Sequence, residues 1–144
     1  MEVVFARRSL AGALGSVSRC GGDTMEMRYH HMGVPTTAPR GGETYLHEFK
    51  MYTSGFDSSP YGVEWLRFEP DCPLPELVRT VPHVAFVVDD ISAAIAGKDI
   101  LIQPNSPSPG VTVAFIVHDG APIEFVQFSG PDSEVWPGNA TDEK

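Results

Sequence analysis

The 144-residue sequence predicts an α+β fold built from two copies of one βαβββ-like unit. Three observations predict it: short apolar strands separated by strong turn signals, a similar strand at the end of each half, and a helical pattern in the second half only. With 42% hydrophobic residues, the composition is ordinary for one soluble globular domain. At this length folding removes about 70% of the unfolded chain's surface from water, so the core does not need disulfides.

Charge and hydropathy exclude two classes of partner. Ten basic residues stand against nineteen acidic ones, a net charge of −9, which opposes binding to the phosphates of nucleic acid. No apolar run approaches the ~20 residues that cross a bilayer. The two cysteines, Cys20 and Cys72, are too few for a disulfide framework and favour a reducing compartment. We expect a soluble protein whose partner is a small-molecule substrate.

Residues 1–24 form an N-terminal extension with three arginines and only two acidic residues. This composition is typical of an organellar transit peptide. An upstream-start artefact explains it equally well, because Met25 and Met27 stand just before the first strand. We expect a cytoplasmic protein, or one of the mitochondrial or another organellar matrix if the extension is a transit peptide.

The first half contains three predicted strands and no helix. The strand over 28–34 stops at Pro35, and two prolines and two glycines make 35–46 a loop. Alternating apolar residues predict strands over 47–55 and 61–69, joined in a hairpin by FDSSP. This half therefore predicts β-strands around an irregular loop.

The second half follows a Pro-rich linker over 71–82 and has the order β-α-β-β-β. Asp89 or Asp90 is expected to cap a short Ala-rich helix that ends near Gly97. The predicted strands are 83–88, 99–103, 111–117 and 122–128. Residues 129–144 have little periodicity and are expected to be a flexible tail.

An internal repeat relates the two halves. YGVEWLRF (61–68) aligns without a gap with APIEFVQF (121–128), and HMGV (31–34) aligns with HVAF (83–86). The repeated histidines are 52 residues apart and the repeated glutamates 60, so the first half is shorter by about one short helix. The first unit is thus expected to have its helix shortened or missing.

Duplication points to a metal site. If the units pack about a pseudo-twofold axis, His31, Glu64, His83 and Glu124 can converge on one point. Both glutamates share a strand face with apolar residues, where an ionised carboxylate is costly unless it is paired or bound to a cation. Two imidazoles and two carboxylates suit Zn, Ni, Co, Mn or Fe better than Ca or Mg.

Three segments carry a family resemblance: HHMGVPT (30–36), PHVAFVVDDISAAIAG (82–97) and DGAPIEFVQF (119–128). They are similar to the vicinal-oxygen-chelate (VOC) superfamily of glyoxalase I, methylmalonyl-CoA epimerase, extradiol dioxygenases and bleomycin-resistance proteins. The resemblance covers residues 27–128. It implies that the eight strands of two modules form a cupped, incomplete barrel around a metal.

The resemblance also implies a ligand set. Members with four protein ligands take one from the first and one from the last strand of each module, which by position gives His31, Glu64, His83 and Glu124.

Several neighbouring residues are alternatives. His30 is a rival of His31 but is expected on the opposite face of its strand, and Glu69 is a second acidic choice beside Glu64. Arg67 and Tyr61 can either reach into the cup or remain solvated, and we expect surface positions for His47 and His118.

The main functional hypothesis is a metal-dependent isomerase, epimerase or lyase that removes a proton next to a carbonyl, with Glu124 or Glu64 as the general base. The alternatives are a non-catalytic small-ligand-binding protein of the bleomycin-resistance type and an Fe(II) dioxygenase. A dioxygenase needs only three protein ligands, so Glu64 argues against it. The shortened first half leaves a sheet edge that favours a homodimer.

Overall fold

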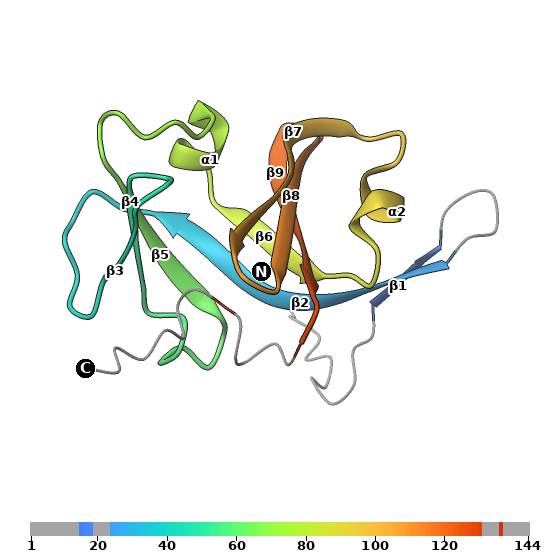
Figure 1. The fold of residues 1–144 in the computed structure, drawn as a ribbon, viewed down its shortest axis with the longest axis horizontal. Helices are drawn as coiled ribbons and strands as arrows, with labels where there is room; N and C mark the ends of the chain where they lie inside the picture. Colours follow the sequence, from blue (N-terminus) through green and yellow to red (C-terminus); the bar gives the residue numbers. More distant parts are fainter. Residues whose placement is uncertain (1–14, 19–23, 131–135, 137–144) are drawn as a thin grey trace, which may run out of the picture.

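The computed structural model describes residues 15–18, 24–130 and 136, which form one curled sheet with two short helices (Figure 1). The strands of the main sheet are β2 (Thr24–Pro35), β3 (Thr44–Leu46), β4 (Met51–Ser54), β5 (Val63–Phe68), β6 (His83–Val87), β7 (Asp99–Ser108), β8 (Val111–His118) and β9 (Ala121–Phe128). The helices are α1 (Glu76–Thr80) and α2 (Ile91–Ile95). Within these residues neither helix is long and apolar enough to span a bilayer.

The order of the strands is that of a duplicated unit. The main sheet runs β3-β4-β5-β2-β6-β9-β8-β7, so the first strands of the two units, β2 and β6, lie side by side and antiparallel at its centre. Each is flanked by the last strand of its own unit in parallel orientation, β5 beside β2 and β9 beside β6. The predicted α+β fold, an incomplete eight-stranded barrel with reduced helices, is confirmed.

The register across the central strands shows the twofold relationship at single residues. His31 pairs with Ala85, and Gly33 pairs with His83. Exchanging each residue for its repeat partner converts the first pair into the second. The alignment of HMGV with HVAF is therefore also a structural equivalence.

The same equivalence extends to the outer strands of each unit. Gly33 lies opposite Glu64 in the first unit, and Ala85 lies opposite Glu124 in the second. The two glutamates thus occupy matching places on matching strands, as the sequence repeat predicted.

The first unit has no helix, as expected, but its strands differ from prediction. β3 lies inside the segment 35–46 that we predicted as a loop, and it pairs with β4 at the edge of the sheet. A strand of three residues after a Gly pair is too short to show a period of two. The strand predicted over 47–55 covers only Met51–Ser54, because the chain turns through Lys50 at a φ of 49°.

Cationic and aromatic side chains of the first unit stack in pairs. The guanidinium of Arg40 lies 4.6 Å from the ring centre of Trp65, and that of Arg67 lies 4.0 Å from the ring centre of Tyr52. Glu43 accepts hydrogen bonds from Nε and Nη2 of Arg67 at 2.8 and 3.0 Å. These stacked pairs shield the aromatic rings.

The second unit keeps its helix. Asp90 caps α2, since its side chain accepts a hydrogen bond from the Ala93 amide, and the chain turns at Gly97 with a φ of 69°. Ile91 and Ala94 face the sheet and pack with Val88, Ala114, Ile116 and Phe125. The predicted helix and cap are confirmed.

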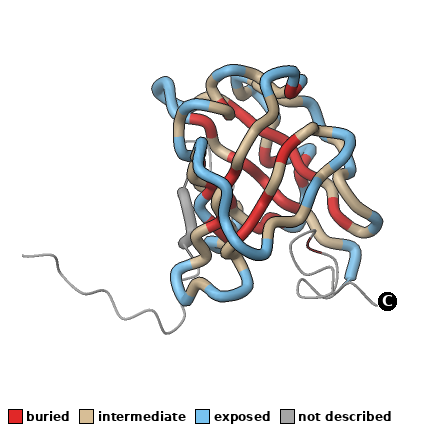
Figure 2. The backbone as a smooth tube through the Cα atoms, turned by 90° about the vertical axis from the view of Figure 1, so that its left-hand side faces the viewer, coloured by how far each residue is buried: buried red, intermediate tan, exposed pale blue. Residues whose placement is uncertain are grey.

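Two segments outside the repeat also contribute structure. α1 lies in the linker over 71–82, and its residue Val78 is buried. The five residues of α1 are too few to show a helical period in the sequence. β1 (Gly15–Ser18) pairs antiparallel with the start of β2, so part of the N-terminal extension 1–24 adds a strand beside β2. Figure 2 shows that the buried positions follow the strands and that the loops are exposed.

Candidate metal centre

Three buried side chains from adjacent strands converge inside the sheet. Nε2 of His31 on β2 and Nε2 of His83 on β6 lie 3.2 and 2.9 Å from the same oxygen, Oε2 of Glu124 on β9. The two ring nitrogens are 3.3 Å apart. The exposed fractions are 1%, 3% and 5%, so bulk water does not separate these groups. The sequence prediction placed all three at one site, and the structure brings them together.

The close approach of His83 depends on the residue opposite it. A Cβ atom at Gly33 would lie 2.2 Å from Cε1 of the His83 ring, which no side chain can accommodate without moving the ring. The glycine of the HMGV motif therefore makes room for the second histidine. Its repeat partner Ala85 shows that the fold itself does not demand glycine there.

The three groups form a charged network. Burial alone would raise the pKa of Glu124, but the charge of His31 and hydrogen bonds from His31 and His83 outweigh it and lower the pKa to about 2. For His31 burial favours a lower pKa, and the charge and hydrogen bond of Glu124 reverse this, so the pKa is raised. Glu124 is therefore ionised, and His31 is its cationic partner when no metal is bound.

The donor set fits a transition-metal ion. Metal–ligand distances of about 2.0–2.2 Å place neighbouring ligand atoms roughly 3 to 3.5 Å apart in tetrahedral or octahedral sites. The three separations of 2.9, 3.2 and 3.3 Å fall at these spacings. All three donor atoms lie within 4.8 Å of one another. Within the described residues, this is the one group of three or more His, Cys, Asp or Glu side chains that could hold a metal ion. Two imidazoles and one carboxylate suit Zn, Ni, Co, Mn or Fe.

Glu64, the fourth predicted ligand, lies beside this group but outside it. It is 5% exposed, and its Oε2 accepts a hydrogen bond from Nε1 of Trp136 at 3.0 Å. Burial raises the pKa of Glu64, and the charge of His31 and the bond from Trp136 offset this only in part. The two repeated glutamates thus have different partners.

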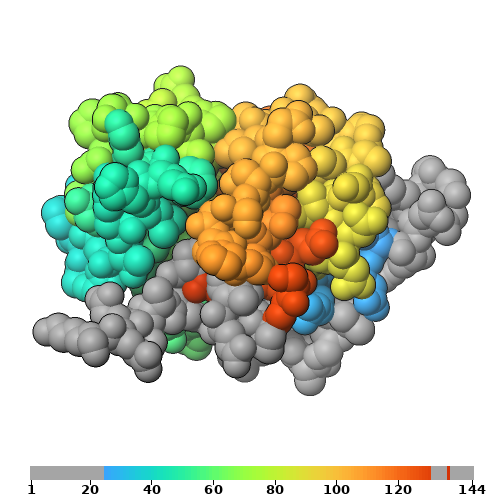
Figure 3. All heavy atoms as spheres, viewed as in Figure 1, coloured from blue at the N-terminus to red at the C-terminus, as the bar shows by residue number. Residues whose placement is uncertain are grey.

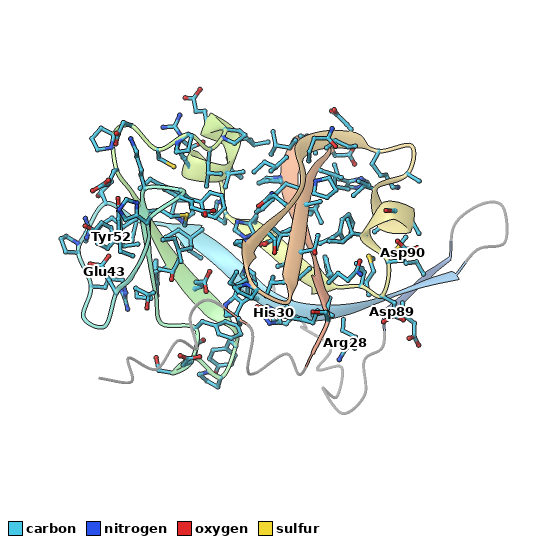
Figure 4. All side chains as sticks on the ribbon, viewed as in Figure 1. Arg28, His30, Glu43, Tyr52, Asp89 and Asp90 are labelled. Atoms are coloured by element: carbon cyan, nitrogen blue, oxygen red, sulfur yellow. The ribbon has the colours of Figure 1, made fainter. Side chains whose placement is uncertain are left out.

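We expected His30 on the opposite face of its strand from His31, and this prediction is wrong. The pairing of β2 with β6 shifts register between Tyr29 and His31, and this irregularity turns the His30 side chain toward its neighbour. Nδ1 of His30 and Nδ1 of His31 are 2.8 Å apart, and the His30 ring stacks on Phe56. Figure 4 shows His30 on β2 near the centre of the molecule, far from Glu43 and Tyr52 at the edge of the first unit.

The protonation of His30 fixes its role. Burial, followed by the charge of His31, lowers the pKa of His30 to about 4, whereas the pKa of His31 is raised. His31 therefore donates from Nδ1 and His30 accepts. This leaves Nε2 of His31 directed at Glu124, the orientation that a metal-binding histidine needs.

A cavity of about 80 Å³ opens onto the three-residue cluster. Its walls are mostly apolar: Leu46, Phe49, Met51, Leu66, Leu74, Val78, Ile102, Pro107, Val113, Phe115 and Trp136. Thr53 and Asn105 are polar members, and among the described residues no lysine or arginine lines it. Figure 3 shows atoms of the first unit, in teal, on the left of this face and atoms of β7, in orange, to the right of its middle.

A second cavity, of about 250 Å³, meets the first at two residues. Glu64 and Thr53 line both. The second cavity is polar and includes Arg40, Thr44, Ser54, Asp57 and Ser58. Glu64 therefore stands between an apolar chamber that holds the cluster and a hydroxyl-lined chamber that does not.

The other sequence candidates lie outside the apolar cavity. Tyr61 is 75% exposed, Arg67 is held by Glu43, and Glu69 accepts a hydrogen bond from the Tyr45 hydroxyl at 2.9 Å. The surface positions predicted for His47 and His118 are confirmed. Of the alternatives left open for Arg67 and Tyr61, neither reaches into the cup.

Sequence reasoning missed Trp136. It belongs to the segment 129–144, which we expected to be a loose tail, yet it is 7% exposed and its ring centre lies 4.8 Å from that of His31. Residues 131–135 and 137–144 of this segment lie outside the described residues. The signal in the sequence was a single tryptophan in an otherwise polar segment with Pro and Gly, since a large apolar side chain there indicates a residue that packs against the domain.

Comparisons with known proteins identify the fold only. No family model matches the sequence, and no curated protein matches it. Among solved structures, a hypothetical protein from Bacillus halodurans C-125 superimposes with a TM-score of 0.57 over 73% of this chain and 96% of that chain. The identity is 17%, so the likeness extends to the arrangement of strands and carries no activity with it.

Proposed function

We propose that this chain is a metal-dependent enzyme of the vicinal-oxygen-chelate type that acts on a small oxygenated metabolite and moves a proton next to a carbonyl. The observation that carries the proposal is the convergence of His31, His83 and Glu124 at the axis that relates the two units. The strand order of two duplicated units and the segments 30–36, 82–97 and 119–128 support the family assignment.

Nε2 of His31, Nε2 of His83 and Oε2 of Glu124 would hold a divalent ion of zinc, nickel, cobalt, manganese or iron. Such an ion supplies Lewis acidity, which polarises a carbonyl and makes the neighbouring C–H group more acidic. Glu124 is held by two imidazoles, so its task is to anchor the site.

Glu64 is the better placed of the two glutamates to act as the general base. It lines the cavity without belonging to the cluster, and the raised pKa brings its carboxylate closer to the basicity that proton abstraction requires. A proton taken up at Glu64 can leave through the polar cavity on its other side. Glu64 would therefore exchange protons with solvent through the second cavity.

The lining of the apolar cavity indicates the substrate class. A chamber without lysine or arginine among its described walls disfavours a phosphorylated or carboxylated group there. We therefore propose an uncharged substrate with two adjacent oxygens, such as a hydroxy-ketone, and a short apolar substituent that contacts Phe49 and Phe115.

Proton exchange tests this function. Wild-type chain loaded in turn with zinc, nickel, cobalt or manganese would be incubated in D₂O with uncharged hydroxy-ketones and hemithioacetals, and deuterium at the carbon next to the carbonyl would be followed by NMR. We expect incorporation with the wild type and none with Glu64→Gln at equal metal content. Exchange by Glu64→Gln at the wild-type rate would contradict the role of Glu64, and absence of bound metal would contradict the function as a whole.

An Fe(II) dioxygenase is the second candidate. In the sequence, Glu64 as a fourth ligand argued against a dioxygenase. In the structure, Glu64 lies outside the three-residue group, so this argument no longer applies. Two histidines and one carboxylate are the ligand set of many non-haem iron oxygenases. Oxygen uptake by the iron-loaded chain with catechols, and by no other metal form, would favour this candidate over proton transfer.

A non-catalytic binding protein is the third. The apolar walls suit an aromatic ligand without turnover. Full stability of metal-free protein, together with tight binding of an aromatic compound and no exchange or oxygen uptake, would favour this reading.

A further inference from the structure

Trp136 reaches the candidate site from the end of the chain and has a fixed orientation there. Its ring centre lies 4.6 Å from that of His30 and 5.9 Å from that of Phe56, as well as close to His31. These rings surround the indole, which is 7% exposed. The indole N–H is directed at Oε2 of Glu64, 3.0 Å away.

The duplicated fold gives no reason for the two glutamates to behave differently. Glu64 and Glu124 lie opposite equivalent residues, Gly33 and Ala85, on equivalent strands. Their side chains nevertheless have different partners: Glu124 contacts two imidazoles, and Glu64 contacts the indole. Trp136 has no counterpart in the repeat, and its hydrogen bond distinguishes the surroundings of Glu64 from those of Glu124.

The chemistry of an indole explains what this contact does. The indole N–H only donates a hydrogen bond and cannot bind a cation. A carboxylate oxygen that accepts this hydrogen bond uses one of its lone pairs to do so. A buried carboxylate without a donor would instead be stabilised by a nearby cation. The indole thus satisfies Glu64 by a route that does not require metal.

We propose that Trp136 is a positioning residue that holds Glu64 outside the metal coordination sphere and so reserves it as a proton acceptor. This inference rests on the proposed function, because it assigns a task to Glu64 at the same site. Loss of the indole N–H frees Glu64 to join His31, His83 and Glu124 as a fourth ligand. Affinity for metal then rises while proton transfer falls.

The test uses the full-length chain, freed of metal, with Co²⁺ as the probe. Trp136→Phe keeps an aromatic ring and removes the donor. Trp65→Phe is the matched control, because Trp65 stacks under Arg40 and does not line the apolar cavity. Affinity is measured by calorimetric titration, and ligand number is measured from the visible absorption of bound Co²⁺, which weakens as coordination number rises.

We expect Trp136→Phe to bind Co²⁺ about tenfold more tightly than wild type, equivalent to about 1.4 kcal/mol, with weaker visible absorption. Trp65→Phe should match wild type in both. The gain should vanish in the double variant Trp136→Phe, Glu64→Gln, since it requires a carboxylate at position 64. Equal affinity and equal spectra for Trp136→Phe and wild type would overturn the inference.

Glu64→Gln alone provides a check that does not depend on the folding of Trp136→Phe. A glutamine keeps an oxygen that accepts the indole N–H, so Co²⁺ affinity should remain within about twofold of wild type. A tenfold loss would show that Glu64 is already a ligand and would overturn the inference while leaving the metal site intact. If the wild-type chain binds no Co²⁺, the proposed function fails and the inference fails with it.

Discussion

Gly33 lies opposite His83 across the two central strands, and a Cβ atom at position 33 would come within 2.2 Å of Cε1 of the imidazole. The absence of one side chain thus sets the position of another that the metal site needs. This relationship leads to the first prediction.

Gly33→Ala should displace the His83 ring and weaken binding of Zn²⁺ or Ni²⁺ by about 10- to 100-fold, as changes to groups that orient a ligand typically do. Crowding in the interior should also destabilise the fold by about 1–3 kcal/mol. Calorimetric titration and urea unfolding measure the two effects. Gly41→Ala is the control, since a Cβ there meets nothing within 4 Å; equal affinity of both variants would contradict the prediction.

Metal stoichiometry should depend on the buried histidine and not on an exposed one. His83→Ala removes a donor from the cluster and should abolish stoichiometric binding, whereas His118→Ala, whose side chain is 71% exposed, should leave it unchanged. Elemental analysis after dialysis measures this. Retention of one equivalent of metal by His83→Ala would place the binding site elsewhere.

The acid stability of the metal-free chain should depend on Glu124. Its pKa is about 2 in the folded chain against an ordinary value of 4.5, so the ionised form stabilises the fold above pH 4.5 and this contribution is lost as the pH falls toward 2. The shift corresponds to stabilisation of the order of 3 kcal/mol. Urea unfolding from pH 6 to pH 2 should show this loss in wild type and a reduced loss in Glu124→Gln.

His30 should make a separate contribution at higher pH. Its pKa is lowered from 6.5 to about 4, so the neutral form is favoured by folding and stability falls as the pH drops from 6.5 through 4. His30→Phe retains the stack on Phe56 and removes the titrating group. The stability difference between wild type and His30→Phe should therefore change by up to about 3 kcal/mol across this range; a pH-independent difference would argue against a buried neutral His30.

Metal binding should release protons. The raised pKa of His31 means that the cationic ring must lose its Nε2 proton before that nitrogen can act as a ligand. Affinity for Zn²⁺ is therefore expected to increase with pH until it passes the pKa of His31. Titration calorimetry in two buffers of different ionisation enthalpy measures the number of protons released, and a value of zero below that pKa would exclude His31 as a ligand.

The repeat in the sequence predicted the fold and three of the residues that converge at the candidate site, but it also counted Glu64 as a ligand and gave no indication of Trp136. Strand residues of alternating orientation and a repeated His and Glu are local patterns, so they identify which side chains face inward even when the strands are far apart in the chain. His31, His83 and Glu124 were found in this way, as was the loss of the first helix. The three residues of β3 and the five of α1 were too short for any period to show.

The tertiary structure decided the roles. Nothing in the sequence distinguishes Glu64 from Glu124, because they occupy equivalent positions, and the difference arises from a tryptophan 72 residues away. Likewise, a period of two assigns His30 to the wrong face, because an irregularity in the pairing with β6 redirects it. Local patterns specify the faces of strands, whereas hydrogen-bond partners and charges depend on which distant segments pack together.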